Sequence, residues 1–191
     1  EKMSGFAGIF ERKNIKNERK ISKKYDAILF GYNRIGFSIL RILKKIKKDY
    51  LVVDFNPDTI EALKKARIPC LYGDVDDADL LSELPLDKIQ LAVSTIPDFE
   101  ANTLLIQTIK RNNPKAIIIV RAHQIDEALD LYKKGASYVL TPHFLGGDYV
   151  AKMIGEMKFY SEDYKEEKEK HIKMLMERLE KGHRHPEVER D

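Results

Sequence analysis

Short apolar runs alternate with longer amphipathic stretches along most of the chain, starting at Tyr25. The runs recur at roughly 20–25 residue intervals, which is the rhythm of βαβ units. They are nearly continuous in apolar character, as parallel strands covered on both faces require. The predicted strands cover residues 27–30, 51–53, 68–72, 89–93, 116–120 and 138–140. The predicted helices cover residues 35–48, 57–66, 76–83, 98–112, 124–134 and 143–160.

Proline and glycine mark several of the predicted helix boundaries. Pro57 and Pro97 lie where a helix is expected to begin, and Pro114 ends the helix before the fifth strand. Gly135 is expected to cap the helix before the sixth strand. Six alternating units with right-handed crossovers predict a Rossmann-like, doubly wound α/β fold with a parallel sheet in the strand order 3-2-1-4-5-6, followed by a C-terminal helical extension.

The two ends of the chain differ in composition from the middle. Residues 1–24 are rich in lysine and arginine and are predicted to form a basic, partly helical linker. Such a segment is either a solvated tail or a juxtamembrane segment, because Lys and Arg concentrate in short loops beside membrane spans. Residues 25–160 are predicted to form the folded domain, and residues 161–191 a charged helical tail. The tail has one narrow apolar stripe, which is solvated or packs on a partner subunit; it consists of Ile172, Leu175, Met176 and Leu179.

Composition narrows the class of protein. The 34 Lys and Arg residues against 31 Asp and Glu residues leave a net charge of only +3, which lacks the excess typical of nucleic-acid binders. No apolar run approaches the roughly 18 residues needed to cross a bilayer, so we expect a soluble chain. The missing start methionine and signal peptide suggest a piece of a longer protein. The single cysteine, Cys70, excludes an internal disulfide and a multi-cysteine zinc site, and is expected to be a buried, inert thiol.

A glycine-containing loop joins the first strand to the following helix and partly matches a dinucleotide-binding fingerprint. It reads Gly31, Tyr32, Asn33, Arg34, Ile35 and Gly36. Gly31 allows the tight turn and Gly36 lets the helix approach the sheet, but Asn33 replaces the second glycine, where a pyrophosphate would lie closest to the backbone. Asn tolerates a positive φ, so we expect the turn to survive the replacement. The helix N-terminus and Arg34 remain available to a phosphate.

Other candidate binding residues follow the next four strands, at the edge where open α/β sheets bind ligands. Asp54 lies 18 residues after Gly36, close to the spacing of an acid that accepts from ribose hydroxyls and disfavours a 2′-phosphate. Its alternative role is to cap the next helix. Arg121 either binds phosphate or pairs with Asp54 or Asp74. The remaining candidates are Phe55, Asn56, Gly73, Asp74, Val75, Ser94, Thr95 and Ile96, with turn chemistry as the alternative for Gly73 and Asp74.

Over about residues 25–155 the chain resembles the RCK (TrkA-N) regulatory domain. The resemblance rests on four segments, with further support from Leu145–Ala151 and from the Phe10–Asn14 linker; the four are Ile28–Gly36, Val53–Pro57, Leu71–Asp74 and Lys134–Pro142. The nearest subfamily is the cytoplasmic domain of Kef-type monovalent cation:proton antiporters.

This resemblance implies a function, a ligand and partners. The implied function is control of K⁺ or Na⁺/proton antiport by an attached membrane domain, at the cytoplasmic face of the cell membrane. The implied ligand is an adenine nucleotide that contacts Asp54 through its ribose, Asp74 through its adenine edge and Arg34 through its phosphate. Asn33 favours AMP over NAD, with NADH, ATP and ADP as alternatives. The implied partner is a second copy of the domain, and nucleic acid is not expected.

Catalysis and metal binding are not expected. A dehydrogenase needs a substrate domain and a positioned acid or base, and six βα units leave no room for them. The five histidines are scattered, although His123 and His143 follow the fifth and sixth strands near the expected ligand edge. Two other functions stay open beside the control of antiport. One is gating of a K⁺ channel or a Trk-type uptake system, and the other, less favoured, is that of an NAD-dependent oxidoreductase fragment.

Overall fold

The computed structural model describes residues 24–180. Except for Lys24, the predicted basic linker lies outside these residues, as does the end of the predicted tail, residues 181–191. The described chain forms two compact units, residues 24–139 and residues 140–180. The predicted boundary at residue 160 stays a prediction. Within residues 24–180, no helix combines the length and the apolar character that crossing a bilayer requires.

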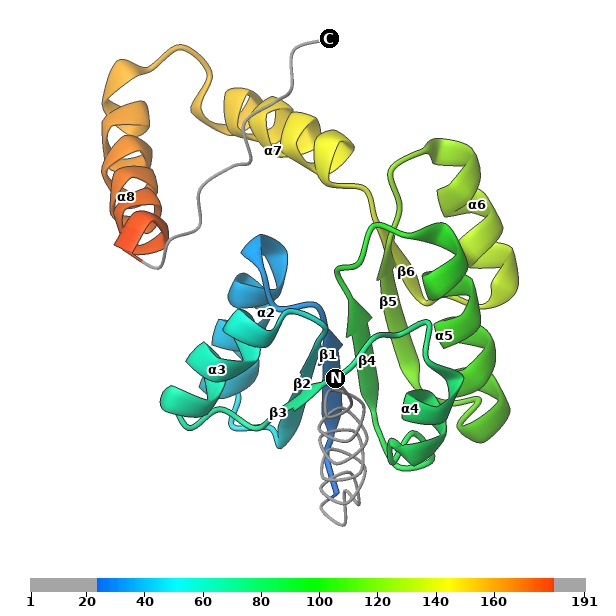
Figure 1. Ribbon diagram of the computed structural model, residues 1–191. Coiled ribbons are helices and arrows are strands. Elements are labelled where there is room, and N and C mark those ends of the chain that lie inside the picture. Colours follow the sequence, from blue (N-terminus) through cyan, green and yellow to red (C-terminus); the bar gives the residue numbers. More distant parts are fainter. Residues whose placement is uncertain (1–23, 181–191) are drawn as a thin grey trace, which may run out of the picture. The chain divides into compact units, whose positions relative to one another are not determined.

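Six strands form one sheet in the order β3-β2-β1-β4-β5-β6, which confirms the predicted topology (Figure 1). Parallel ladders join β1 to both β2 and β4, β2 to β3, and β4 to β5. Because the central strands run in one direction, their carboxyl ends meet at one edge. The strands are β1 (Ala27–Phe30), β2 (Tyr50–Asp54), β3 (Cys70–Tyr72), β4 (Leu91–Ser94), β5 (Ile117–Arg121) and β6 (Tyr138–Leu140).

Helices alternate with the strands as predicted, and most boundaries agree within two residues. The first unit contains α2 (Arg34–Lys45), α3 (Pro57–Lys65), α4 (Ala78–Glu83), α5 (Phe99–Asn112) and α6 (Ile125–Lys134); the second contains α7 (Pro142–Met157) and α8 (Ser161–Glu180). The helix predicted over residues 35–48 ends earlier, because Lys47 has a φ of 54°. The helix predicted over residues 143–160 ends at Met157, because Lys158 has a φ of 51°.

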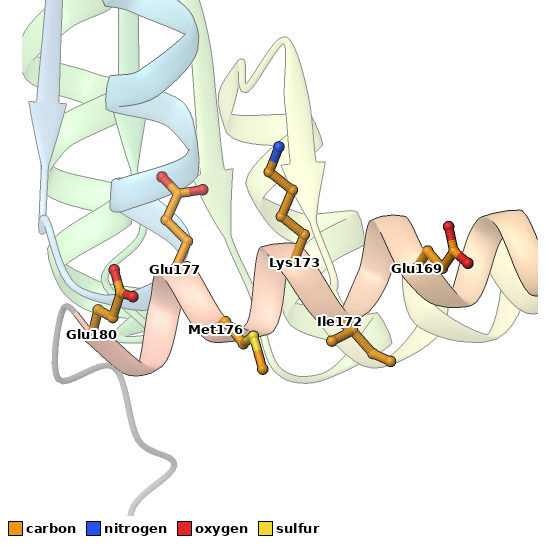
Figure 2. A pocket seen from close by; sticks show the side chains of 6 residues that line it. All are labelled: Glu169, Ile172, Lys173, Met176, Glu177 and Glu180. Atoms are coloured by element: carbon orange, nitrogen blue, oxygen red, sulfur yellow. The ribbon is translucent and has the colours of Figure 1, made fainter.

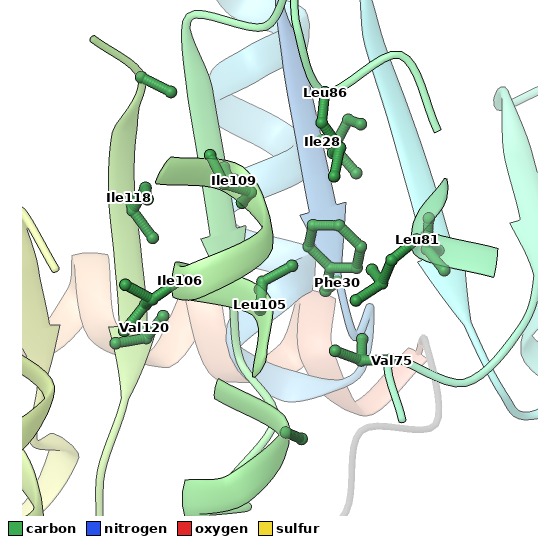
Figure 3. Close-up of a cluster of buried hydrophobic side chains, with 14 of the residues drawn as sticks. Ile28, Phe30, Val75, Leu81, Leu86, Leu105, Ile106, Ile109, Ile118 and Val120 are labelled. Carbon is green, nitrogen blue, oxygen red and sulfur yellow. The ribbon is translucent and has the colours of Figure 1, made fainter. Parts of the chain in front are cut away.

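Alternating side chains of β1 enter two separate cores on the two faces of the sheet. Ile28 and Phe30 belong to a cluster with residues of α4, α5 and α6, whereas Leu29 belongs to a second cluster with α2 and α3. Figure 3 shows the first cluster, whose fully buried members include Ile28, Phe30, Leu105, Ile106, Ile109 and Ile118. Each such side chain contributes about 1.5–3 kcal/mol by leaving water. Burial on both faces explains why the strands are apolar throughout.

The second unit has no buried residue in either of its helices. Among the side-chain hydrogen bonds within it, the Tyr149 hydroxyl donates to Glu167 Oε1 at 2.6 Å, and the Tyr164 hydroxyl donates to the Lys158 carbonyl at 3.0 Å. Its apolar side chains are largely exposed, including Val150, Ile154, Phe159, Leu175 and Met176. For the tail stripe of Ile172, Leu175, Met176 and Leu179, the alternative that it packs on a partner subunit stays a prediction.

Candidate functional site

All of the predicted binding residues lie at the carboxyl ends of β1 to β5 or in the segments that follow directly, so the sheet brings their backbones to one edge (Figure 1). Not every side chain is available there. Val75 is only 2% exposed and packs in the core beneath α4, and Ile96 packs against the same core. A ligand would therefore meet the backbone of Val75 rather than its side chain. The assignment of these residues to a ligand stays a prediction.

The turn between β1 and α2 requires both of its glycines. Gly31 has a φ of +82°, and a Cβ there would lie 2.6 Å from Thr95 Oγ1. A Cβ on Gly36 would collide with the Gly31 carbonyl oxygen. The Gly31 N–H donates to the Val53 carbonyl at 2.8 Å, and the Thr95 hydroxyl donates to the Gly31 carbonyl at 3.0 Å. Neighbouring strands β2 and β4 thus hold the turn from both sides.

Asn33 occupies the N-cap position of α2, but it does not have the positive φ that was expected of it. Its φ is −33° and its ψ is −146°, so the turn needs no left-handed residue at this position. The turn forms with Asn33 in place, as expected, but the reason given for this, a positive φ at Asn33, was wrong. Its side chain makes no capping hydrogen bond, whereas Asn56, Asp77 and Asp98 cap the next three helices.

Asp54 holds the carboxyl end of β2 against this turn. Its side chain is buried, with 7% of the residue exposed. Its Oδ2 accepts from the Tyr32 N–H at 2.8 Å, and its Oδ1 accepts from the Asn56 N–H at 2.9 Å. The capping alternative is corrected, because Asn56 rather than Asp54 caps α3. Each carboxylate oxygen retains acceptor capacity, which is what a ribose diol needs.

Two aromatic residues flank Asp54 in different ways. Phe55 follows it directly and is 63% exposed, which leaves a flat apolar ring at the ligand edge. Tyr32 packs edge-on against Phe37, with 6.3 Å between the ring centroids. Burial raises the pKa of the Tyr32 hydroxyl. Phe55 is therefore the better placed of the two rings to stack on a base.

Gly73 and Asp74 form the turn after β3. The Gly73 N–H donates to the Asp54 carbonyl at 3.1 Å, and a Cβ on Gly73 would lie 2.6 Å from Leu80 Cδ2. Asp74 is exposed and its Oδ1 accepts from the Asp76 N–H at 3.3 Å. Asp74 thus stabilises the turn, which agrees with the alternative of turn chemistry, and its other carboxylate oxygen stays available to a ligand.

Asp76 lies in a negatively charged region. Its pKa is raised by burial first, and then by the charges of Asp74 and Asp98. Asp98 is tied to the N-terminus of α5, where it accepts from the Ala101 N–H at 2.8 Å. The loops after β3 and β4 therefore gather negative charge.

Replacing Asp76 with asparagine is expected to stabilise the protein at neutral pH. The raised pKa means that the folded state binds the Asp76 proton more tightly than the unfolded state does. At neutral pH, where Asp76 is ionised, its charge therefore lowers the free energy of unfolding. The gain should be below about 1 kcal/mol because the carboxylate is exposed, and it should vanish as the pH falls through the raised pKa. Urea unfolding at neutral pH and near pH 3.8, the ordinary value, measures it. The matched control is Asp87→Asn, whose carboxylate faces Lys88 at 3.6 Å; an equal gain at both pH values would contradict the account.

Arg121 places positive charge on the other side of the site. Burial lowers its pKa first, and the neighbouring charge of Arg34 lowers it further. Its Nη1 donates to the Thr95 carbonyl at 3.4 Å, and its Nη2 lies 3.4 Å from His123 Nε2. Within the described residues Arg121 pairs with neither Asp54 nor Asp74, so that alternative is corrected. Two guanidinium groups near an uncapped helix N-terminus favour an anion.

Asn102 is a buried residue of this edge that sequence reasoning missed. It is fully buried in α5, and its Nδ2 donates to the Ile96 and Arg121 carbonyls, both at 2.9 Å. A signal was present in the sequence: Asn102 occupies the apolar stripe of its helix, three and four residues before Leu105 and Ile106. A polar residue at such a position needs buried partners.

The remaining candidates contribute less. Ser94 is buried, and its Oγ accepts from the Ile96 N–H at 3.3 Å. Cys70 is half-buried rather than buried, because β3 lies at an edge of the sheet. Burial raises the pKa of its thiol, with a smaller opposing effect of Lys64. His143 lies in α7, in the second unit. Within residues 24–180 no group of metal-binding side chains meets.

A hollow on α8 does not suit a nucleotide. Figure 2 shows its lining side chains, which are Glu169, Ile172, Lys173, Met176, Glu177 and Glu180. Three glutamates and one lysine are among these residues, so the hollow would repel a phosphate. The edge of the sheet is therefore the better candidate site.

Comparison with known proteins gives one family and several relatives. The sequence pattern of the TrkA-N domain family matches residues 27–142 of this chain. KefC of Cronobacter sakazakii, a glutathione-regulated potassium-efflux system protein, is 30% identical over 129 residues, which is 68% of this chain and 21% of that protein. Potassium channel protein 1 of Methanocaldococcus jannaschii is 26% identical over 144 residues, 74% of this chain and 43% of that protein. The chain thus spans less than half of each relative.

Solved structures share the fold. The TrkA-N domain of the inner membrane protein ybaL of Escherichia coli has a TM-score of 0.65 at 19% identity, covering 70% of this chain and 99% of that one. The AMP-bound C-terminal domain of Kef from Shewanella denitrificans has a TM-score of 0.58 at 18% identity, covering 81% and 93%. The GsuK channel bound to NAD has a TM-score of 0.55 at 20% identity, covering 72% and 26%.

Proposed function

Because this chain belongs to the TrkA-N domain family, we propose that it is a nucleotide-binding regulatory domain of a monovalent cation transport protein. The observation that carries the proposal is the hydrogen bond from the Tyr32 N–H to Asp54 Oδ2, at 2.8 Å. It holds the carboxylate suited to a ribose beside the helix N-terminus suited to a phosphate. A nucleoside phosphate presents both groups to such a site.

The proposed ligand is AMP. Its ribose hydroxyls would donate to Asp54, and its phosphate would lie at the N-terminus of α2 between Arg34 and Arg121. Its base would stack on exposed Phe55, with its exocyclic amine toward Asp74. One phosphate matches a positively charged region bounded by two arginines, and Asn33 replaces the glycine at which a pyrophosphate would lie closest to the backbone. The likeness to the AMP-bound Kef domain supports this choice.

The proposed partners are a second copy of the chain and an attached membrane domain. KefC and Potassium channel protein 1 are longer proteins that are named for potassium transport, which supports this attachment. In the proposed mechanism, nucleotide binding changes how two domains pack and thereby controls K⁺ or Na⁺/proton antiport at the cytoplasmic face of the membrane. A ligand can do so only if its affinities for the two arrangements differ. The proposal includes no chemical step, because it assigns the side chains at this edge to holding a ligand.

A second candidate function is gating of a potassium channel. The similarity to Potassium channel protein 1, which covers 74% of this chain, supports it. The two functions differ in proton movement, because an antiporter exchanges each cation against protons and a channel does not. Flux measurements on the full-length protein in vesicles, with a pH-sensitive dye inside, separate them.

Calorimetry and thermal unfolding with AMP, ADP, ATP, NAD and NADH test the proposed ligand. AMP is expected to bind best and to raise the unfolding temperature, because a ligand of the native state alone adds about 2.7 kcal/mol at one hundred times its Kd. In Asp54→Asn an amide NH₂ replaces one acceptor oxygen, so AMP affinity should fall at least tenfold, or about 1.4 kcal/mol.

Asp87→Asn is the matched control, since it removes an exposed carboxylate from the loop before β4 and should leave AMP affinity unchanged. Preferential binding of NAD or NADH would replace AMP by a dinucleotide and point to redox sensing. If no adenine nucleotide binds, the proposed function is wrong.

A further inference from the structure

Asn102 lies where the backbone pairing of two strands stops. The ladder between β4 and β5 ends at the pair Val93 and Ile119. Beyond it, the side-chain Nδ2 of Asn102 donates to the Ile96 and Arg121 carbonyls at 2.9 Å each. One amide group of α5 therefore joins the two chain segments after their own hydrogen bonds have ended.

The contacts of Asn102 lead directly to the candidate phosphate region. Arg121 is the last residue of β5, and its guanidinium donates to the Thr95 carbonyl, one residue before Ile96. The Thr95 hydroxyl in turn donates to the Gly31 carbonyl. Asn102 thus fixes the backbone of Arg121 relative to the segment that holds the β1–α2 turn.

The burial of Asn102 makes this link stringent. The residue is 0% exposed, so water cannot replace the two hydrogen bonds if the amide is removed. Its Oδ1 makes no hydrogen bond, and neither does Arg121 Nε, which is also buried. Within the described part of the chain, the Asn102 side chain is therefore held only through its Nδ2, which donates to both carbonyls. The Arg121 guanidinium is held through its two terminal nitrogens, Nη1 and Nη2.

We infer that Asn102 is a positioning residue that sets the affinity for the ligand's phosphate group by holding Arg121 toward the N-terminus of α2. The inference rests on the proposed function. Asn102 itself lies beneath the site and would not touch the nucleotide. Replacing Asn102 should accordingly weaken the binding of the phosphate group and leave the binding of the nucleoside nearly unchanged.

The test compares the affinities of the chain for AMP and for adenosine. Asn102→Leu keeps the approximate shape and removes both donors, so we expect AMP affinity to fall by about tenfold while adenosine affinity changes less than about twofold. With Arg121→Gln already present, the same change should not alter the ratio of the two affinities further, because the residues act through one contact. Asn102→Ser, which retains one donor, should show the same selectivity with a smaller loss, and it carries the comparison if Asn102→Leu does not fold.

Thr103→Val is the matched control, because Thr103 is the next residue of α5 and its buried hydroxyl has no hydrogen-bond partner. It should leave both affinities unchanged. Equal losses for AMP and adenosine, or an unchanged ratio in Asn102→Leu and Asn102→Ser, would overturn the inference alone. Failure of the unaltered chain to bind AMP would overturn the proposed function and this inference together.

Discussion

Gly36→Ala is expected to destabilise the protein by about 3 kcal/mol or more, the upper end of the range for overpacking a buried site. The added Cβ would collide with the Gly31 carbonyl oxygen, which is a backbone atom. That carbonyl cannot move freely, because it accepts from the Thr95 hydroxyl while the Gly31 N–H is bonded to Val53. Alanine would gain about 1 kcal/mol in helix propensity, which is too little to offset the collision. Urea unfolding followed by circular dichroism measures the loss.

Two other glycines serve as controls for this effect. Gly73→Ala meets the Leu80 side chain, which is fully buried but is not held by hydrogen bonds as a carbonyl is, so its loss should be smaller, about 1–2 kcal/mol. Gly155→Ala meets no atom within 4 Å inside helix α7 and should be neutral or stabilising. Equal losses for Gly36→Ala and Gly73→Ala would show that contact with backbone is not what decides the effect.

Neutralising both arginines of the site, with Arg34→Gln and Arg121→Gln, is expected to weaken AMP binding by roughly 100-fold or more. Each charge-assisted hydrogen bond to a phosphate contributes about 1.5–3 kcal/mol, and two are lost. Adenosine, which has no phosphate, should bind with nearly unchanged affinity. Titration calorimetry with both ligands measures the two affinities.

The stability of the protein without nucleotide should rise, although the affinity for AMP falls. Burial first, and then the Arg34 charge, lowers the pKa of Arg121, so the charged guanidinium is disfavoured in the folded state and Arg121→Gln should slightly stabilise the protein. The control is Arg111→Gln, an exposed position in the last turn of α5, which should alter neither property. Loss of adenosine binding in the double variant would contradict a role confined to the phosphate.

The sheet order could be predicted, and so could the edge of the sheet at which the candidate residues gather, because both follow from the alternation of apolar runs and loops. Gly31 and Gly36 were identifiable for the same reason, since the turn between a parallel strand and its helix restricts those positions sterically. Helix α7 was predicted too long because Lys158 interrupts it with a positive φ, and no glycine or proline marks the break.

The side-chain roles at the site were less accessible to sequence reasoning. Val75 was predicted to meet the ligand because it follows a strand, but position in a loop does not give the direction of a side chain, and this one enters the core. Asn102 was missed because its partners, Ile96 and Arg121, lie six and nineteen residues away along the chain. Only the pairing of β4 beside β5 brings the three together.

The β1–α2 turn owes its shape to the protein's own groups. Asp54, Val53 and Thr95 each hold it by a hydrogen bond from a neighbouring strand. A turn fixed in this way is preorganised, so a ligand that binds there loses little affinity to ordering the loop. Under the proposed function, the turn would therefore act as a rigid part of the site, and we expect the response to a nucleotide to start from the neutralisation of Arg34 and Arg121 rather than from a movement of the turn.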